Sequence, residues 1–215
     1  MKKRTFTSLA ALAIALAPAA LSARPMTADD LVSLRRIAMP TVSPDGRWVA
    51  YQLRETDLAA NKGRTDLWLL DLSRKGASPV RIGSVADKNE HDPSFSADGK
   101  SLYFLSDASG SDQLWRVPLA GGAAEQVTSL ATDVAGYRFS PEGSRLAIWA
   151  DRDLACTDFN CTGLPEAKKT GTGRVYDESF VRHWDTWAEP GVRSRLFVFP
   201  VQVGKAVGNG VPVST

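Results

Sequence analysis

A four-residue turn sequence occurs three times in this chain, and it constrains the fold more than any other feature. The copies are Ser43-Pro44-Asp45-Gly46, Ser96-Ala97-Asp98-Gly99 and Ser140-Pro141-Glu142-Gly143. Serine and aspartate side chains hydrogen-bond to nearby backbone groups, and glycine adopts positive φ without a steric penalty. An apolar residue precedes each copy and an apolar run follows it. Each copy therefore predicts the tight connection of a β-hairpin.

Two more strand-like segments follow each turn. The third segment of each unit carries an aromatic residue and covers Asp66–Leu72, Gln113–Leu119 and Arg195–Val201. The fourth covers Pro79–Ile82, Glu125–Ser129 and Pro212–Thr215. The turn glycines lie 53 and 44 residues apart. A four-stranded unit of about 40 to 50 residues is the period of a β-propeller blade.

Both faces of the third segments carry apolar residues. Along Asp66–Leu72, Trp68 and Leu70 alternate with Leu67 and Leu69. A sheet that is apolar on both faces has to lie between two other layers, as a propeller blade does. We therefore predict an all-β fold, an incomplete β-propeller of about three four-stranded blades with WD40-like, SPDG-type repeats. The blades are expected at about 40–83, 91–129 and 134–215.

The first 23 residues have the layout of a secretory signal peptide. Basic residues at positions 2–4 precede the apolar run Leu9–Leu21, and the small residues Ser22 and Ala23 follow it. This run is short for a bilayer span. We expect cleavage after position 22 or 23 and a periplasmic or secreted mature protein without a membrane span. An uncleaved anchoring helix is the alternative.

Charge gives no argument for a polyanionic partner. Removal of the leader takes away three basic residues and no acid, which changes the net charge from +2 to −1. The remaining cations do not cluster in the sequence. A near-neutral chain of this kind does not indicate a nucleic acid or an anionic membrane surface as a partner.

The two cysteines, Cys156 and Cys161, are close in sequence, and an oxidising compartment favours a disulfide between them. A metal site would need two more ligands, and His91 and His183 do not lie at a zinc-ligand spacing from this pair. We predict a local disulfide, no metal and no cofactor.

Thr27 and Asp30 form a capping-box pattern before an amphipathic stretch, which predicts a lead-in helix within 24–39. The third unit is irregular. From turn glycine to strand aromatic there are 22 residues in the first unit, 16 in the second and 54 in the third. A long insertion in a regular scaffold is often functional, and here it covers about 151–190.

The sequence resembles the N-terminal propeller of bacterial prolyl oligopeptidase-family serine peptidases. The resemblance rests on the run Arg182-His183-Trp184-Asp185 within this insertion, on the SPDG-type turns and on the exported context. The branch that it resembles contains dipeptidyl-peptidases and acylaminoacyl-peptidase-like enzymes. The resemblance covers the whole mature chain. It implies a propeller that gates and filters peptide substrates for an α/β-hydrolase domain. That domain carries a Gly-x-Ser-x-Gly nucleophile elbow, which this sequence lacks. We therefore expect no catalytic residue in this chain.

In the resembling enzymes, propeller insertions bind and orient the peptide. The candidate substrate-binding residues are Arg182, His183, Trp184, Asp185 and Trp187. An arginine and an aspartate suit the charged groups of a peptide, and tryptophans suit the wall of a pocket. The alternative is that this segment folds on itself and only covers the blade.

Three functional readings remain open. The chain is the propeller portion of an exported serine peptidase, a non-catalytic periplasmic binding module that resembles the Tol translocation propeller, or a truncated product without function. Three blades are fewer than a closed propeller needs, so the two end sheets would expose apolar faces and unpaired edges. This expectation predicts self-association of the isolated chain.

Overall fold

The computed structural model describes residues 24–83, 87–161, 176, 182–184, 186–187, 189 and 191–213, so the expected signal peptide lies outside the described residues. One short helix, α1 (Ala28–Ser33), precedes the strands. The first sheet contains β1 (Arg36–Val42), β2 (Trp48–Asp57), β3 (Lys62–Asp71) and β4 (Val80–Ile82). The second contains β5 (Glu90–Phe95), β6 (Ser101–Ser106), β7 (Gln113–Pro118) and β8 (Glu125–Gln126).

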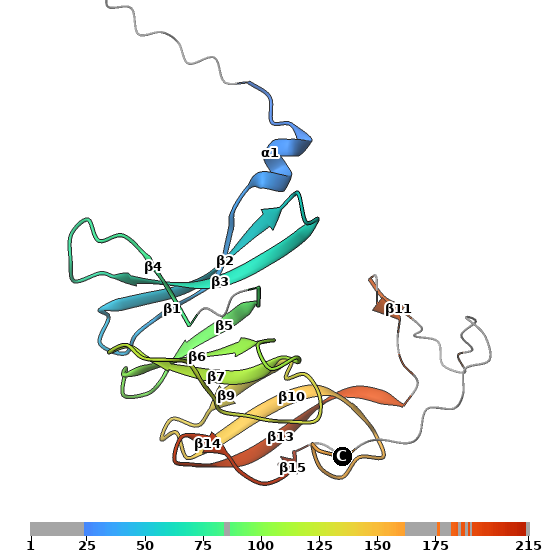
Figure 1. The fold of residues 1–215 in the computed structure, drawn as a ribbon. Coiled ribbons are helices and arrows are strands. Elements are labelled where there is room, and N and C mark those ends of the chain that lie inside the picture. Colours follow the sequence, from blue (N-terminus) through green and yellow to red (C-terminus); the bar gives the residue numbers. More distant parts are fainter. Residues whose placement is uncertain are drawn as a thin grey trace, which may run out of the picture. The chain divides into compact units, whose positions relative to one another are not determined.

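The third sheet contains β9 (Gly136–Phe139), β10 (Arg145–Asp153) and β13 (Val192–Gln202), and β14 (Lys205–Ala206) and β15 (Val211–Pro212) both pair with β13. A separate hairpin is formed by β11 (Arg182–His183) and β12 (Thr186–Trp187). In all three sheets the strands pair antiparallel, and apart from β15, which joins β13, they follow sequence order. This is the blade topology that the sequence repeat predicts (Figure 1).

The helix α1 begins with the predicted capping box. The backbone N–H of Asp30 donates to Thr27 Oγ1 at 3.2 Å, and the backbone N–H of Thr27 donates to Asp30 Oδ2 at 2.8 Å. The helix lies within the expected lead-in segment 24–39 but occupies only part of it, because β1 already begins at Arg36. Residues 36–38 pair with β2, and Pro40 disfavours helical geometry at Met39.

The repeated turns are fixed by their own side chains. In the first turn Ser43 Oγ donates to Asp45 Oδ1 at 2.6 Å, and the N–H of Gly46 donates to the carbonyl of Ser43 at 2.9 Å. The glycine has a φ of +71°, where a larger residue would be strained. The second turn has the same pattern, with Ser96 Oγ donating to Asp98 Oδ1 at 2.6 Å. The hairpin interpretation of these sequences is confirmed.

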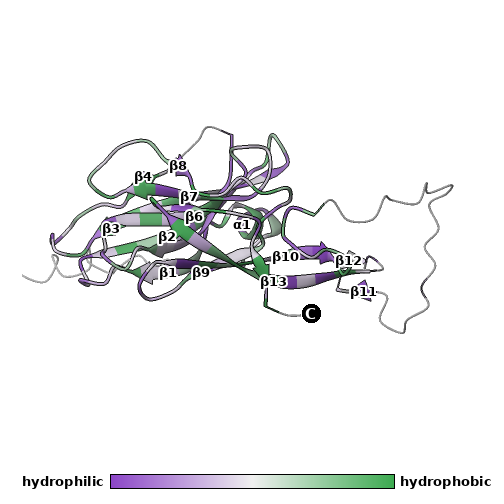
Figure 2. Cartoon of the chain, turned by 90° about the horizontal axis from the view of Figure 1, so that it is seen from below, coloured by the Kyte–Doolittle hydropathy of each residue, from purple (hydrophilic) through white to green (hydrophobic). Residues whose placement is uncertain are grey.

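Two apolar cores lie between the three sheets. The core between the first and second sheets contains the buried residues Ala50, Leu67, Leu69, Leu102, Phe104 and Val117. The larger core, between the second and third sheets, includes Leu105, Leu114, Tyr137, Ile148, Phe197 and Phe199. The second sheet is therefore covered on both faces, as predicted. Figure 2 shows the apolar residues along strands such as β2, while one end of β13 is hydrophilic.

The first and second sheets share a kink that the sequence analysis missed. Pairing along β1 is interrupted between Ala38 and Thr41, and pairing along β5 is interrupted between His91 and Ser94. At these bulges Met39 and Asp92 have positive φ angles of 49° and 53°. A proline follows each of these two residues. The sequence signal for the bulge is therefore an X-Pro pair whose first residue lies three positions before the apolar residue that precedes the turn.

Candidate functional site

The insertion in the third sheet emerges at a defined end of the sheets. Strands β2, β6 and β10 each start at an SPDG-type turn and run away from it, so the connections that follow them begin at the opposite end. These connections cover 58–61, 107–112 and 154–191. We call this end the insertion end and the other the turn end. At the insertion end the N–H of Val134 donates to the carbonyl of Asp112 at 2.8 Å, which joins the second and third sheets.

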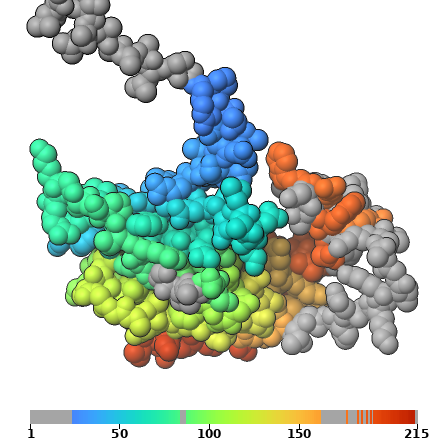
Figure 3. Space-filling model, turned by 45° about the horizontal axis from the view of Figure 1, so that its top comes forward, coloured from blue at the N-terminus to red at the C-terminus, as the bar shows by residue number. Residues whose placement is uncertain are grey.

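The predicted substrate-binding run forms the β11–β12 hairpin. Arg182 is the register partner of Trp187, and its guanidinium carbon lies 5.2 Å from the centre of the Trp187 ring. Trp184 lies in the turn with a φ of +54° and is 87% exposed, while Trp187 is 45% exposed. The orange part of the chain, which includes this hairpin, lies on the surface in Figure 3. The hairpin thus presents two tryptophans and a cation to solvent.

Tyr176 extends this aromatic group, and the sequence analysis did not single it out. Its ring stacks with that of Trp187 at a centroid distance of 6.2 Å and an interplanar angle of 19°. Tyrosine, tryptophan and arginine are the residues enriched at binding hot spots. Of the other predicted residues, His183 belongs to β11, but its side chain is not described, and Asp185 lies outside the described residues.

The predicted disulfide between Cys156 and Cys161 is present, but its loop is part of the core. Phe159, inside the loop, is fully buried against Phe197 and Phe199, at ring distances of 5.2 and 5.8 Å. The guanidinium of Arg152 lies over the Phe159 ring and also contacts the carbonyl of Cys161. The first part of the expected insertion is therefore structural.

His91 belongs to an ionisable pair at the insertion end. Its Nε2 lies 3.4 Å from Asp112 Oδ2. Burial of the imidazole by itself lowers the pKa of His91, but Asp112, with smaller contributions from Asp92 and Asp107, outweighs burial, and the pKa is raised. The backbone N–H of Asp112 also donates to Asp133 Oδ1 at 2.8 Å. Protonated His91 thus stabilises a loop that contacts the third sheet.

Replacing His91 by glutamine is expected to cost stability mainly at low pH. Because the folded-state pKa is raised, the contribution of His91 is fully present below its ordinary pKa of 6.5 and is lost as the pH rises through the raised value. Urea unfolding of both proteins between about pH 5.5 and 8.5 measures the difference. A difference that stays constant over this range would contradict the pairing with Asp112.

Within the described part of the chain, no group of three histidine, cysteine, aspartate or glutamate side chains is arranged to hold a metal ion. The same residues include no helix that is long and apolar enough to cross a membrane.

The model of the TolB β-propeller domain family matches residues 30–179, which is more than half of the chain. The chain belongs to this family. Among curated proteins it is similar to dipeptidyl-peptidase 5 of Porphyromonas gingivalis, with 28% identity over 194 residues that cover 88% of this chain and 28% of that protein. It is also similar to the uncharacterised peptidase YuxL of Bacillus subtilis, with 28% identity over 57% of this chain and 18% of that protein.

Solved structures show the same fold. The acylaminoacyl peptidase of Pyrococcus horikoshii matches 85% of this chain with a TM-score of 0.60 and 16% identity, over 26% of its own length. The AtxE2 isopeptidase matches 86% of this chain with a TM-score of 0.55 and 20% identity, over 32% of its own length. The TolB-family chain therefore has the fold of peptidase propellers and spans about a third or less of these relatives.

Proposed function

We propose that this chain is the propeller portion of an exported serine peptidase of the prolyl oligopeptidase family, which removes dipeptides or acylated residues from peptides. In this role the propeller filters substrates, and an α/β-hydrolase domain of the same protein supplies the catalytic residues. The similarity to dipeptidyl-peptidase 5 over 88% of the chain is the observation that carries the proposal. Export through residues 1–23 to the periplasm or medium, and the division into blades at 40–83, 91–129 and 134–215, belong to the same proposal.

Activity of the full-length gene product tests this function. Purified from its host, the product should release the chromophore from dipeptidyl or acyl-aminoacyl substrates, and a serine-directed phosphonate should abolish the activity by stoichiometric reaction. A full-length product that neither turns over these substrates nor reacts with the phosphonate would contradict the peptidase proposal.

Within that function, the hairpin β11–β12 contacts the peptide. The support is its composition and exposure, since Trp184 is exposed at the turn and Arg182 is held over the Trp187 ring. The aromatic rings suit apolar side chains of the substrate, and the guanidinium suits a carboxylate. Asp185 and His183 remain candidate contacts on the same hairpin by sequence alone.

Replacing Trp184 by alanine in the full-length enzyme is expected to raise KM about fivefold or more and to leave kcat nearly unchanged, because the change removes binding contacts and no reacting group. Arg182→Ala should raise KM most for acidic peptides. Val203→Ala, at an equally exposed position in the β13–β14 turn, is the matched control and should leave KM unchanged. Unchanged kinetics for both hairpin variants, with lowered stability, would assign the hairpin to packing.

A binding module without catalysis is the second candidate, and the match to the TolB family model over residues 30–179 favours it. In that case the protein acts through protein contacts, and the hairpin is its natural docking element. Two results together would support this candidate. The full-length product would show no peptidase activity and no reaction with the phosphonate, and it would specifically capture a periplasmic protein in a way that Trp184→Ala abolishes. Self-association of the isolated 215-residue chain stays a prediction, and sedimentation measures it.

A further inference from the structure

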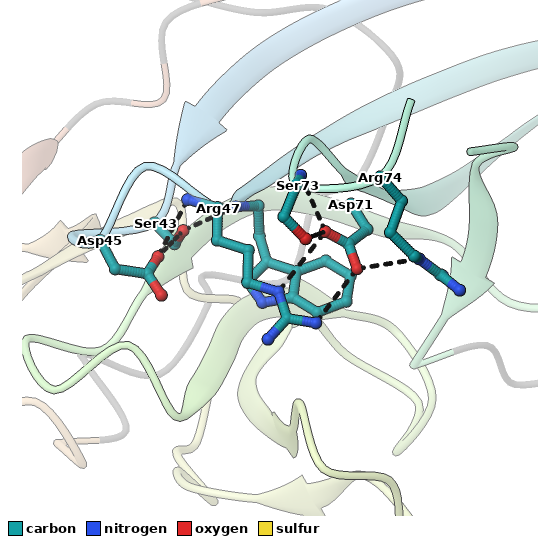
Figure 4. Close-up of polar contacts among 7 residues, drawn as sticks. Ser43, Asp45, Arg47, Asp71, Ser73 and Arg74 are labelled. Carbon is teal, nitrogen blue, oxygen red and sulfur yellow. Dashed lines mark hydrogen bonds and ion pairs between the residues drawn. The ribbon is translucent and has the colours of Figure 1, made fainter. Parts of the chain in front are cut away.

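A second polar cluster lies at the turn end, away from the insertion. The Asp71 carboxylate is 3% exposed and accepts hydrogen bonds from two arginines. Arg47 donates through Nη2 at 3.1 Å and Nε at 3.4 Å, and Arg74 donates through Nε at 3.2 Å. Ser73 adds its backbone N–H at 3.0 Å and its hydroxyl at 2.5 Å. Figure 4 shows these groups converging on the one carboxylate.

This cluster is not needed to build a blade. Asp71 is the register partner of Trp48, the first residue of β2. The corresponding pairs in the second and third sheets are Ser101 with Pro118 and Arg145 with Pro200. Two of the three sheets thus form the same turn and strand end with a proline in place of the aspartate. A buried acid that the repeat does not require indicates a role beyond the fold.

The acceptor capacity of Asp71 is used up by its donors, so the carboxylate positions the arginines and is not itself free to bind a ligand. These hydrogen bonds, those from Arg47 first, hold the pKa of Asp71 well below its usual range, and the carboxylate stays charged. Among the described residues, Arg74 donates only through Nε and is 74% exposed on its side chain. Both of its Nη groups therefore keep donors for another acceptor.

Arg74 borders a groove of about 320 Å³ between the first and second sheets. The lining of the groove includes the apolar residues Leu69, Ile82, Val117 and Leu119, together with Trp48 and Arg81. Arg81 is paired with Asp66. The charges of the three arginines at positions 47, 74 and 81 are balanced by three carboxylates, those of Asp45, Asp66 and Asp71. Arg74 therefore offers the groove its unused Nη donors and not a net charge. Gly121 and Gly122 also line the groove and contribute no side chains.

We propose that this groove binds an extended peptide segment that carries an acidic side chain next to apolar ones. The Nη groups of Arg74 suit one carboxylate of the peptide. The apolar lining residues take the neighbouring side chains, and β4, which borders the groove, is an edge strand of its sheet and offers backbone groups for pairing. The site is separate from the hairpin at the insertion end and does not depend on peptidase activity.

Calorimetric titration of the full-length protein with two blocked peptides tests this site. The probes are N-acetylated, C-amidated pentapeptides with a central glutamate or a central glutamine between leucines, and the protein is first treated with a serine-directed phosphonate to prevent cleavage. We expect the glutamate peptide to bind at least about fivefold more tightly than the glutamine peptide, the scale of one partly exposed ion pair. In Arg74→Gln this preference should disappear.

Arg64→Gln is the matched control. Arg64 lies near the other end of β3, its side chain is 45% exposed, and it pairs with the exposed Asp87 at 2.9 Å. This variant should keep the preference for glutamate. The proposal would be overturned if wild type and Arg74→Gln preferred the glutamate peptide over the glutamine peptide to the same extent. It would also be overturned if the glutamate peptide did not bind at millimolar concentration. Binding of inorganic phosphate that Arg74→Gln abolishes, without peptide binding, would overturn the assignment of a peptide as the ligand.

Discussion

Replacing Gln113 by alanine is expected to lower the free energy of unfolding by about 4 kcal/mol, one of the two largest effects we expect from a single substitution. Gln113 is 1% exposed. Its Nε2 donates to the carbonyls of Leu130 and Thr132 at 3.3 and 3.1 Å, and its Oε1 accepts from the N–H of Leu130 and the hydroxyl of Thr128, both at 2.9 Å. Alanine removes the partner of one buried group, on Thr128, and of three partly buried groups, on Leu130 and Thr132. Each buried group left without a partner costs about 1 to 3 kcal/mol.

The substitution should also loosen the connection between the second and third sheets, because the side chain of Gln113 fixes this connection. Guanidinium unfolding measures the free energy, and hydrogen exchange at the Leu130 amide measures the loosening of the connection. Gln126→Ala is the matched control, since Gln126 is only half-buried and its side chain makes one hydrogen bond, to Ser109 at 3.3 Å. A loss below about 1 kcal/mol for Gln113→Ala would show that water replaces the amide in this network.

The fold could be predicted from the sequence because its signals are local and repeated. Each SPDG-type turn carries its own hydrogen-bonding groups, such as Ser43 and Asp45, and these groups act within a few residues. The capping box of Thr27 and Asp30 is equally local. Apolar residues on both faces of Gln113–Leu119, such as Leu114 and Val117, correctly placed that strand between two neighbouring layers. Where a side chain acts on its own backbone neighbourhood, the sequence is sufficient.

The features that sequence reasoning missed depend on contacts between distant residues. Asp71 looks like an ordinary polar residue at a strand end, and its role appears only because pairing places Arg47 beside it, 24 residues away in sequence. Asp92 adopts positive φ, and its backbone is held by Gln52 from the first sheet and Tyr137 from the third. Neither partner can be identified without the register of the sheets.

The candidate site was predicted in part, for the same reason. The run from Arg182 to Trp187 is conspicuous by composition, and the pairing of Arg182 with Trp187 follows once the short hairpin is formed. The contact between Tyr176 and Trp187 could not be predicted in this way, because no repeat or strand pattern in the sequence relates Tyr176 to the hairpin. The cysteine loop was assigned to the insertion on its position alone, whereas Phe159 makes it part of the core.

Phe159→Ala is expected to cost about 3 to 5 kcal/mol, the range for removing a fully buried phenylalanine. The ring fills the space against Phe197 and Phe199, and the backbone N–H of Phe159 donates to the carbonyl of Asn209 at 2.8 Å. Without the ring, the cysteine loop loses its anchor in the core. Guanidinium unfolding gives the cost, and Leu154→Ala, at an exposed position just before the loop, should cost less than about 0.5 kcal/mol.

Removing the disulfide with and without the Phe159 ring tests whether this ring holds the cysteine loop in the core. Replacing both Cys156 and Cys161 by serine should cost about 2 kcal/mol in the otherwise unchanged protein, because a short closed loop removes entropy from the unfolded chain. In Phe159→Ala the same replacement should cost much less, since a loop that has left the core gains similar freedom in the folded and unfolded states. Strictly additive losses would mean that the loop stays docked without its phenylalanine, and that Arg152 and the backbone contact with Asn209 are sufficient to hold it.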